Sequence, residues 1–385
     1  MVVTMEPGVP ANGESVAAVV RKAQEYGLNP DVKTEKGKKY VLTQVFLRDG
    51  SKTLSASVPE HIFRGLPDVN AVVRVTPPRV SVFHRGNGDH HKVDVGGGMI
   101  GTGLPCLLVA GPCTVDTNIN AIAEGLAKQG IRRLRGGCWK PRSSPYSFPG
   151  FGEKSVQWLL RAAKEHNMSS VFTEVMESSH IDVIRRIKRK VRYHGTVVLW
   201  VGARTANPIL LRALGAQLEF PVMVKNSLDA LGVDDLFERA EWVLSGNITW
   251  GENGDLDPKR SLRSANHHVI LCLRGTRQTD RRSPWRFNPN HHWTELVQSQ
   301  SWAPVAIDPS HSAGNRDLVY RNIKTALSFS PSLLIVEGGY PAKGFPGPYG
   351  QGFCDVSQMV PAEHMCHVSE LVTAHNVEKY RKETF

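Results

Sequence analysis

Short apolar runs alternate with amphipathic segments along the chain from residue 106 onward. Each run has the length and composition of a strand buried on both faces, and the segments between them repeat apolar residues at helical spacing, as in Ser155–His166 and Asp317–Ser328. The eight runs are CLLVAG (106–111), RRLRGG (132–137), SVFTEV (170–175), VVLWVGA (197–203), PVMVKN (221–226), HVILCLRG (268–275), PVAIDPS (304–310) and SLLIVEGG (332–339). This alternation predicts an α/β fold, a (β/α)8 barrel over residues 106–385, with a doubly wound sheet as the alternative.

The first 78 residues follow a different pattern of strand, helix, strands, helix and strand. This order predicts a small ferredoxin-like α+β domain over residues 1–78. Its predicted elements are a strand at 2–5, a helix at Ser15–Tyr26, a strand at Tyr40–Leu47, a short helix at Pro59–Leu66 and a strand at Asn70–Val75. Pro77-Pro78 directly precede residues 79–105, which include a Gly- and His-rich stretch at 84–103, so we expect a linker and a lid-like hairpin at the entry to the barrel.

Length and composition are those of a globular protein with about two domains, since the chain has 385 residues, 41% of them hydrophobic and 22% charged. No apolar run approaches the roughly 18 residues of a membrane span, and the first residues lack the form of a signal peptide. We therefore expect a cytoplasmic protein without a membrane partner. The six cysteines are scattered and form no Cys-x-x-Cys pair, which argues against a disulfide scaffold or a zinc knuckle.

The chain is basic, with 47 Lys and Arg against 36 Asp and Glu and a formal charge of +11. Such a charge is compatible with nucleic acid, an anionic surface or anionic small molecules as partners. The run Arg185–Arg192 is the strongest indication of a nucleic-acid binder, but it lies on a predicted outer helix without interleaved aromatic residues. A solvated face or a subunit contact is the better interpretation, and we expect no nucleic-acid partner.

Polar residues follow the predicted strands at their carboxyl ends, where a barrel carries its chemistry. One set offers a thiol, an imidazole and two carboxylates: Cys113, His311, Glu337 and Asp355. Each alone has a structural interpretation, because a cysteine after a buried strand usually packs in the core and a strand-end histidine usually makes a structural hydrogen bond. Together, on one face of one barrel, they suit a single divalent metal ion such as Mn²⁺, Fe²⁺, Co²⁺ or Zn²⁺.

A second set consists of cations that would converge on the same mouth. Buried like charges repel and are costly to desolvate, so they require anions such as phosphates or carboxylates. Six cations predict more than one anionic group, unless several of them point outward as solvated charges. The six are Arg135, Lys140, Arg142, Arg204, Lys225 and Arg274.

Motifs at the strand ends resemble those of type I 3-deoxy-D-arabino-heptulosonate 7-phosphate (DAHP) synthases. They are Ala110-Gly111-Pro112-Cys113, Leu134-Arg135-Gly136-Gly137, Lys140-Pro141-Arg142-Ser143-Ser144-Pro145, Gly202-Ala203-Arg204 and Asp308-Pro309-Ser310-His311. The beta subtype is most similar, because there a ferredoxin-like domain precedes the TIM barrel. The resemblance implies a transferase of the shikimate pathway that condenses phosphoenolpyruvate with erythrose 4-phosphate, the first step of aromatic amino acid biosynthesis. The related 3-deoxy-octulosonate 8-phosphate synthases usually carry Lys-Ala-Asn-Arg-Ser-Ser where this chain has Lys140–Ser144.

The resemblance also implies a role for each site residue. Cys113, His311, Glu337 and Asp355 would hold the metal ion, which polarises the aldehyde. Arg135, Lys140, Arg204, Lys225 and Arg274 would hold phosphoenolpyruvate, with Lys140 also a proton donor, and Pro141, Arg142, Ser143 and Asp308 would face the aldose phosphate. Glu174 would orient water or Lys225. An aromatic amino acid effector and a homotetramer or homodimer are further expectations from the family.

Several features depart from the beta-subtype pattern, and they gather on the acceptor side of the pocket. Leu273 replaces a glutamate before Arg274-Gly275, Asn226 replaces an arginine after Lys225, and residues 248–266 form an apparent insertion. Glu337 and Asp355 are also unusually far apart in the sequence. A paralogue that uses a different aldose phosphate, and a regulatory homologue without turnover, are therefore the alternative hypotheses.

Overall fold

The computed structural model describes residues 1–37, 39–50, 55, 58–74, 91–142, 144–247, 265–340 and 356–383. The chain divides into two compact units. One contains residues 1–74, and the other contains residues 91–246 and 266 onward. The predicted domain boundary near residue 78 lies within 75–90, outside the described residues.

The N-terminal unit has the predicted ferredoxin-like order of elements. They are β1 (Val2–Met5), α1 (Glu14–Glu25), β2 (Asn29–Lys36), β3 (Val41–Arg48), α2 (His61–Arg64) and β4 (Val69–Val73). The sheet is antiparallel in the order β2-β3-β1-β4. Its core packs Val3, Val45 and Val72 against α1 and α2 through Val19 and Phe63. The polar edge strand β2 has no apolar alternation, and its charged residues suit an unpaired sheet edge.

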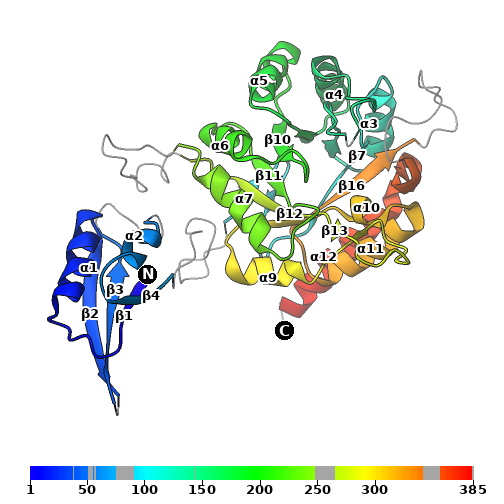
Figure 1. Cartoon of the computed structure of the whole chain (residues 1–385). Coiled ribbons are helices and arrows are strands. Elements are labelled where there is room, and N and C mark those ends of the chain that lie inside the picture. Colours follow the sequence, from blue (N-terminus) through cyan, green and yellow to red (C-terminus); the bar gives the residue numbers. More distant parts are fainter. Residues whose placement is uncertain are drawn as a thin grey trace. The chain divides into compact units, whose positions relative to one another are not determined.

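The second unit is a closed barrel of eight parallel strands (Figure 1). Its strands are β7 (Leu107–Gly111), β8 (Arg133–Arg135), β9 (Ser170–Glu174), β10 (Thr196–Val201), β11 (Val222–Lys225), β12 (Val269–Leu273), β15 (Val305–Ile307) and β16 (Leu333–Gly339). Each strand pairs with the next in the chain, and β16 pairs with both β15 and β7. This closure confirms the barrel and excludes the doubly wound sheet. Each of the eight apolar runs coincides with one of these strands, and only β10 begins one residue before its run.

Helices surround the strands, as Figure 1 shows. They are α3 (Ile119–Lys128), α4 (Glu153–Glu165), α5 (Ser179–Val191), α6 (Pro208–Ala216), α7 (Asp234–Leu244), α9 (Trp293–Gln300), α10 (Pro309–Ala313), α11 (Arg316–Ser328) and α12 (Met365–Glu383). One apolar core lies between strands and helices, and a second, including Val109, Phe172 and Ile270, fills the barrel. Because both faces of each strand are buried, the strands read as continuous apolar runs. None of the described helices is long and apolar enough to cross a membrane.

The hairpin of β5 (Val93–Asp94) and β6 (Met99–Ile100) closes the N-terminal end of the barrel. Val93 and Ile100 join the interior core, and Ser169, just before β9, donates a hydrogen bond to the Gly96 carbonyl at 3.1 Å. Gly96 has φ +83°, and a Cβ there would lie 2.5 Å from the Ser169 carbonyl oxygen. The hairpin is therefore a plug at the end opposite the strand C-termini. A hairpin is therefore present at the entry to the barrel, and the sequence alone did not say which end of the barrel it would cover.

Candidate active site

A cavity of about 280 Å³ opens at the carboxyl ends of the barrel strands. Its walls are strongly basic, because seven Lys and Arg side chains reach it from different strand ends and loops. Among the described residues, the cavity is lined by Cys113, Arg135, Lys140, Pro141, Arg142, Ser144, Ser147, Glu174, Trp200, Gly202, Ala203, Arg204, Lys225, Arg274, Arg286 and His311. All six cations predicted from the sequence line it. The alternative, that several of them point away into solvent, is excluded.

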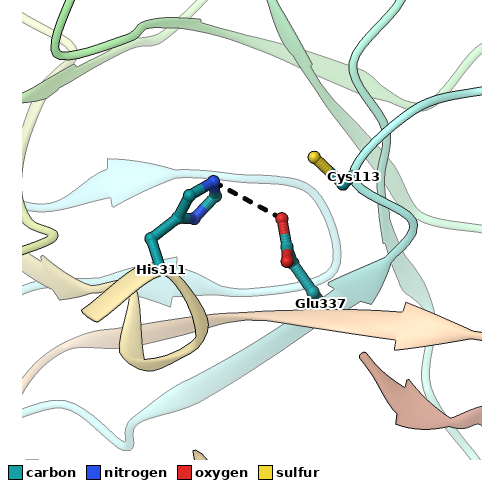
Figure 2. A group of neighbouring side chains, drawn as sticks. All are labelled: Cys113, His311 and Glu337. Carbon is teal, nitrogen blue, oxygen red and sulfur yellow. Dashed lines mark ion pairs between the residues drawn. The ribbon is translucent and has the colours of Figure 1, made fainter. Parts of the chain in front are cut away.

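Cys113, His311 and Glu337 form a cluster at the cavity (Figure 2). They come from the loop after β7, from α10 and from β16, and one ligand atom of each lies within 4.8 Å of the others. His311 directs Nε2 at Glu337 Oε1, 3.4 Å away, while its Nδ1 lies 2.7 Å from Asp308. A carboxylate behind a ring nitrogen is the usual support of a metal-binding histidine. The donor set fits one divalent transition metal ion. Asp355 lies outside the described residues.

Backbone hydrogen bonds connect the loops after β7 and β8, and this connection brings Lys140 close to Cys113. Thr114 and Gly137 form a parallel bridge, and the Val115 amide donates to the Gly137 carbonyl at 2.9 Å. Lys140 Nζ then donates to the Cys113 carbonyl at 2.9 Å and lies 3.2 Å from Cys113 Sγ. The ammonium of Lys140 is therefore held beside the candidate metal ligands.

Two buried arginines present donors without a partner in the described structure. Arg135 is 1% exposed, its guanidinium lies 5.2 Å from the Trp200 ring, and Nη2 donates to Glu337 at 3.4 Å. Among the described residues, its Nε and Nη1, and Nη1 of Arg274, have no hydrogen-bond partner, although Arg135 Nη1 lies 4.0 Å from Asp308 Oδ2. Buried donors are costly to leave unsatisfied, and a bound anion would satisfy them.

Burial and neighbouring charges act in opposite directions on these two arginines. Burial lowers the pKa of Arg135, but the carboxylates of Glu337 and Asp308 outweigh it, so the net shift is upward. At Arg274, burial lowers the pKa; Asp308 opposes this, while the charges of Arg286 and Arg204 add to it. The side of the cavity around Arg274 therefore carries uncompensated positive charge.

Asp308 lies behind the cavity wall and is completely buried. Its Oδ2 lies 2.6 Å from Lys225 Nζ and 2.7 Å from His311 Nδ1, and Oδ1 accepts from the His311 amide at 3.2 Å. Burial would raise the pKa of Asp308, but His311 and Lys225 hold it well below its usual range. Conversely, burial lowers the pKa of His311, and Asp308 and Glu337 together raise it above its usual value. Asp308 is not among the residues that line the cavity.

The side assigned to the acceptor sugar is formed by the loop after β8. Pro141 and Arg142 line the cavity together with Ser144 and Ser147. Arg142 Nε donates to the Phe148 carbonyl at 2.9 Å, which holds the loop closed on itself. Ser143 lies outside the described residues. Arg204 is exposed at the rim, whereas Glu174, the last residue of β9, is buried in the wall.

Sequence reasoning missed Arg286 and Trp200 as lining residues. Trp200 could have been found, because Val198, Trp200 and Gly202 alternate along one run and so share the interior face. Its ring lies 5.2 Å from the Arg135 guanidinium and 5.1 Å from Lys225 Nζ. Arg286 directly precedes β14 (Phe287–Asn288), which pairs with β13 (Thr276–Arg277). No local pattern distinguishes it from the neighbouring arginines of that segment.

Comparison with known proteins places this geometry in a family. The model of the DAHP synthetase I family matches residues 85–339. The phospho-2-dehydro-3-deoxyheptonate aldolase of Thermotoga maritima is 28% identical over 339 residues, which cover 88% of each chain. A crystal structure of the Thermotoga maritima DAHP synthase has a TM-score of 0.71 at 26% identity, covering 100% of this chain and 97% of that one.

A second solved structure supports the fold alone. It is a truncated form of the Thermotoga maritima enzyme, with a TM-score of 0.58 at 24% identity over 79% of this chain and 96% of that chain. The family model covers all eight barrel strands and well over half of the sequence. The chain therefore belongs to the DAHP synthetase I family.

Proposed function

We propose that this chain is a transferase that condenses phosphoenolpyruvate with erythrose 4-phosphate to give DAHP and inorganic phosphate. The observation that carries the proposal is the convergence of seven cations on one cavity beside the Cys113, His311 and Glu337 cluster. Two phosphorylated substrates, one also a carboxylate, would bring negative charge to this basic cavity. Membership of the DAHP synthetase I family supports the choice of reaction.

Phosphoenolpyruvate occupies the buried half of the cavity in this proposal. Arg135 and Arg274 satisfy their unpartnered donors with its phosphate and carboxylate, and Lys140, Lys225 and Arg204 complete the set. Asp308 holds Lys225 by a short ion pair and thereby fixes the direction of its ammonium. We assign Asp308 to this positioning role, because its carboxylate faces Lys225 and His311.

The acceptor sugar occupies the half formed by the loop after β8. Arg142 binds its phosphate, and Pro141 shapes the wall beside it. Ser143 stays the predicted partner of Arg142 in this role. The aldehyde end of the sugar then lies toward Cys113 and Lys140, whose Nζ and Sγ are 3.2 Å apart.

A divalent metal ion, Mn²⁺, Fe²⁺, Co²⁺ or Zn²⁺, would be held by Cys113, His311 and Glu337, with Asp355 as the predicted fourth ligand. When bound, it would polarise the aldehyde carbonyl and stabilise negative charge on its oxygen. Asp308 behind His311 orients the ring so that Nε2 faces this site.

The chain's own groups then handle the protons of the condensation. A carbon–carbon bond forms between C3 of phosphoenolpyruvate and the aldehyde carbon, and Lys140 gives a proton to the former carbonyl oxygen. Water then adds to C2, and the C2–O bond to phosphate breaks. Glu174 orients either this water or Lys225. One water is consumed and one phosphate released, so the atoms balance.

Assay of the purified full chain tests the proposal. Incubation with both substrates and Mn²⁺ should release phosphate and form DAHP in equal amounts, and a chelator should abolish both. Cys113→Ser should lower metal content and activity together, and unchanged metal content and activity would refute the proposed site. Five-carbon aldose phosphates provide the second arm of the assay, since equal or better use of one of them would identify the chain as a paralogue with another acceptor.

The remaining expectations are part of the same proposal. They are a cytoplasmic location, a homotetramer or homodimer, and an aromatic amino acid effector. All three derive from the sequence and the family and stay predictions.

A further inference from the structure

Gln358 connects the candidate metal site with a cavity arginine that has no assigned role. It is the last residue of the short 3-10 turn η2 (Val356–Gln358), and its side chain is completely buried. Its amide nitrogen donates to Glu337 Oε2, and its amide oxygen accepts from Arg286 Nη1 at 3.3 Å. The neutral side chain of Gln358 therefore bridges a carboxylate and a guanidinium.

The backbone around Gln358 is held in place by three contacts. Ser357 Oγ donates to the Gly314 carbonyl at 3.0 Å, and Arg316 Nε donates to the Met359 carbonyl at 2.9 Å. The strand β17 (Val360–Pro361) pairs with the end of β16, with Val360 opposite Gly338. The amide is therefore presented to Glu337 from a fixed position.

The bond to Glu337 determines which carboxylate oxygen is available at the cluster. With Oε2 held by Gln358, Oε1 faces His311 Nε2 and Arg135 Nη2, each 3.4 Å away. Hydrogen bonds to the second oxygen of a ligating carboxylate orient it, and their loss typically lowers metal affinity about 10- to 100-fold.

The bond to Gln358 ties the Arg286 side chain, which lines the cavity, to a neutral acceptor. Its guanidinium lies 5.3 Å from the Phe287 ring, and that of Arg274 lies 4.6 Å from the same ring. Burial is the main cause of the lowered pKa of Arg274, and the positive charge of Arg286 lowers it further. A carboxylate at position 358 would add a negative charge beside Arg286, whereas the amide oxygen of glutamine accepts its hydrogen bond and adds none.

We propose that Gln358 is a positioning residue that holds Glu337 and Arg286 at once, and that Arg286 is a further anion-binding residue of the cavity. The inference rests on the proposed function, since the anion is one of the two phosphorylated substrates. The part of the inference that concerns Glu337 and metal binding depends only on the cluster of Cys113, His311 and Glu337.

Three variants separate the two ends of the Gln358 amide. Gln358→Met has a similar length and loses both bonds, so Mn²⁺ affinity should fall about 10- to 100-fold. Arg286→Met removes only the guanidinium and should leave Mn²⁺ affinity within about threefold, while the KM of one phosphorylated substrate rises about tenfold or more. Gln358→Glu should raise the same KM although Arg286 is present, because the new carboxylate pairs with it. It should also lower Mn²⁺ affinity, because the donor to Glu337 is lost and a second carboxylate faces Glu337 Oε2.

The measurements are calorimetric titration of chelator-treated full chain with Mn²⁺ alone, and KM and kcat for both substrates at saturating Mn²⁺. Gln298→Met is the matched control, because this side-chain amide on α9 donates a hydrogen bond to the Ser330 carbonyl and is absent from the cavity wall.

A folded Gln358→Met with wild-type Mn²⁺ affinity would overturn the positioning role of Gln358, and unchanged KM values in Arg286→Met would overturn the role of Arg286. If Gln358→Met does not fold, Arg286→Met still decides whether Arg286 binds an anion, and the Mn²⁺ affinity of Gln358→Glu decides the contact with Glu337. Absence of turnover in the wild type would instead refute the proposed function, and the Mn²⁺ titration would still be informative.

Discussion

Contacts with neighbouring polar groups fix the orientation of the buried carboxylates around this cavity. Asp308 Oδ2 contacts both Lys225 Nζ and His311 Nδ1, and Glu337 lies between His311, Arg135 and Gln358. Unpaired charges would be costly in such an environment, and these contacts compensate most of that cost. The donors left over on Arg135 and Arg274 therefore have a functional rather than a structural explanation.

Glu174 depends on the absence of a side chain at Gly202. A Cβ on Gly202 would lie 2.1 Å from Glu174 Oε1, and Glu174 is only 5% exposed, so it has little room to move. We expect Gly202→Ala to lower kcat about 100-fold, with a small change in melting temperature, because it would misplace the carboxylate that we propose orients water or Lys225. Gly232→Ala is the control, because a Cβ at Gly232 meets nothing within 4 Å. Full activity in Gly202→Ala would show that the position of Glu174 is unimportant.

At the scale of elements, the short helix α10 places His311. Asp308 caps its first turn by accepting from the His311 amide, so the residue that orients the ring also starts the helix. Directly after α10, Asn315 caps α11 by accepting from the Leu318 amide at 3.0 Å. Two side-chain caps thus define the segment that carries the histidine.

Loss of the second cap should destabilise the barrel measurably. In Asn315→Ala the Leu318 amide loses its acceptor, which should cost about 1 kcal/mol of unfolding free energy. For a unit of this size we expect a melting temperature lower by about 2–4 °C. Asn315→Asp retains an acceptor and should melt close to the wild type. Equal melting of the alanine and wild-type proteins in calorimetric scans would contradict the capping role.

For the molecule as a whole, the basic side chains behind the net charge of +11 gather in two different places. The basic run on α5 is an outer face whose Arg185 pairs with Asp182 and Glu219 and whose Arg186 pairs with Glu153. The cavity cations, in contrast, come from strand ends around the whole barrel and face one another. Only the second group gathers in one cavity, where bound anions would compensate its charge.

Substrate should therefore stabilise the folded chain. Phosphoenolpyruvate at 100 times its dissociation constant should add about 2.7 kcal/mol, because it binds the folded state and not the unfolded one. We expect the melting temperature to rise by about 5–10 °C. Sodium chloride at equal ionic strength is the control for screening of surface charge and should have a much smaller effect. An equal rise with both salts would argue against a specific anion site in the cavity.

Much of the fold and of the site could be predicted from local patterns. The eight strands were evident because burial on both faces makes each an apolar run, and the site was evident because barrel chemistry lies where such runs end. The edge strand β2 was not assigned because its side chains are polar. Arg286 and Gln358 were missed because they lie in loop or turn segments away from the strand ends, where no periodicity marks them.

The sequence by itself determined the order of elements, the six cations and the Cys, His and Glu donors, since these depend on periodicity and position along the chain. Tertiary structure decided that the sheet closes through β15 and β16, that the hairpin of β5 and β6 plugs the N-terminal end, and that Asp308 lies behind the wall. It also decided which donors of Arg135 stay unsatisfied. The reason is that such features depend on contacts between distant residues, as between Arg135 and Glu337, 202 positions apart, whose geometry exists only once the barrel has closed.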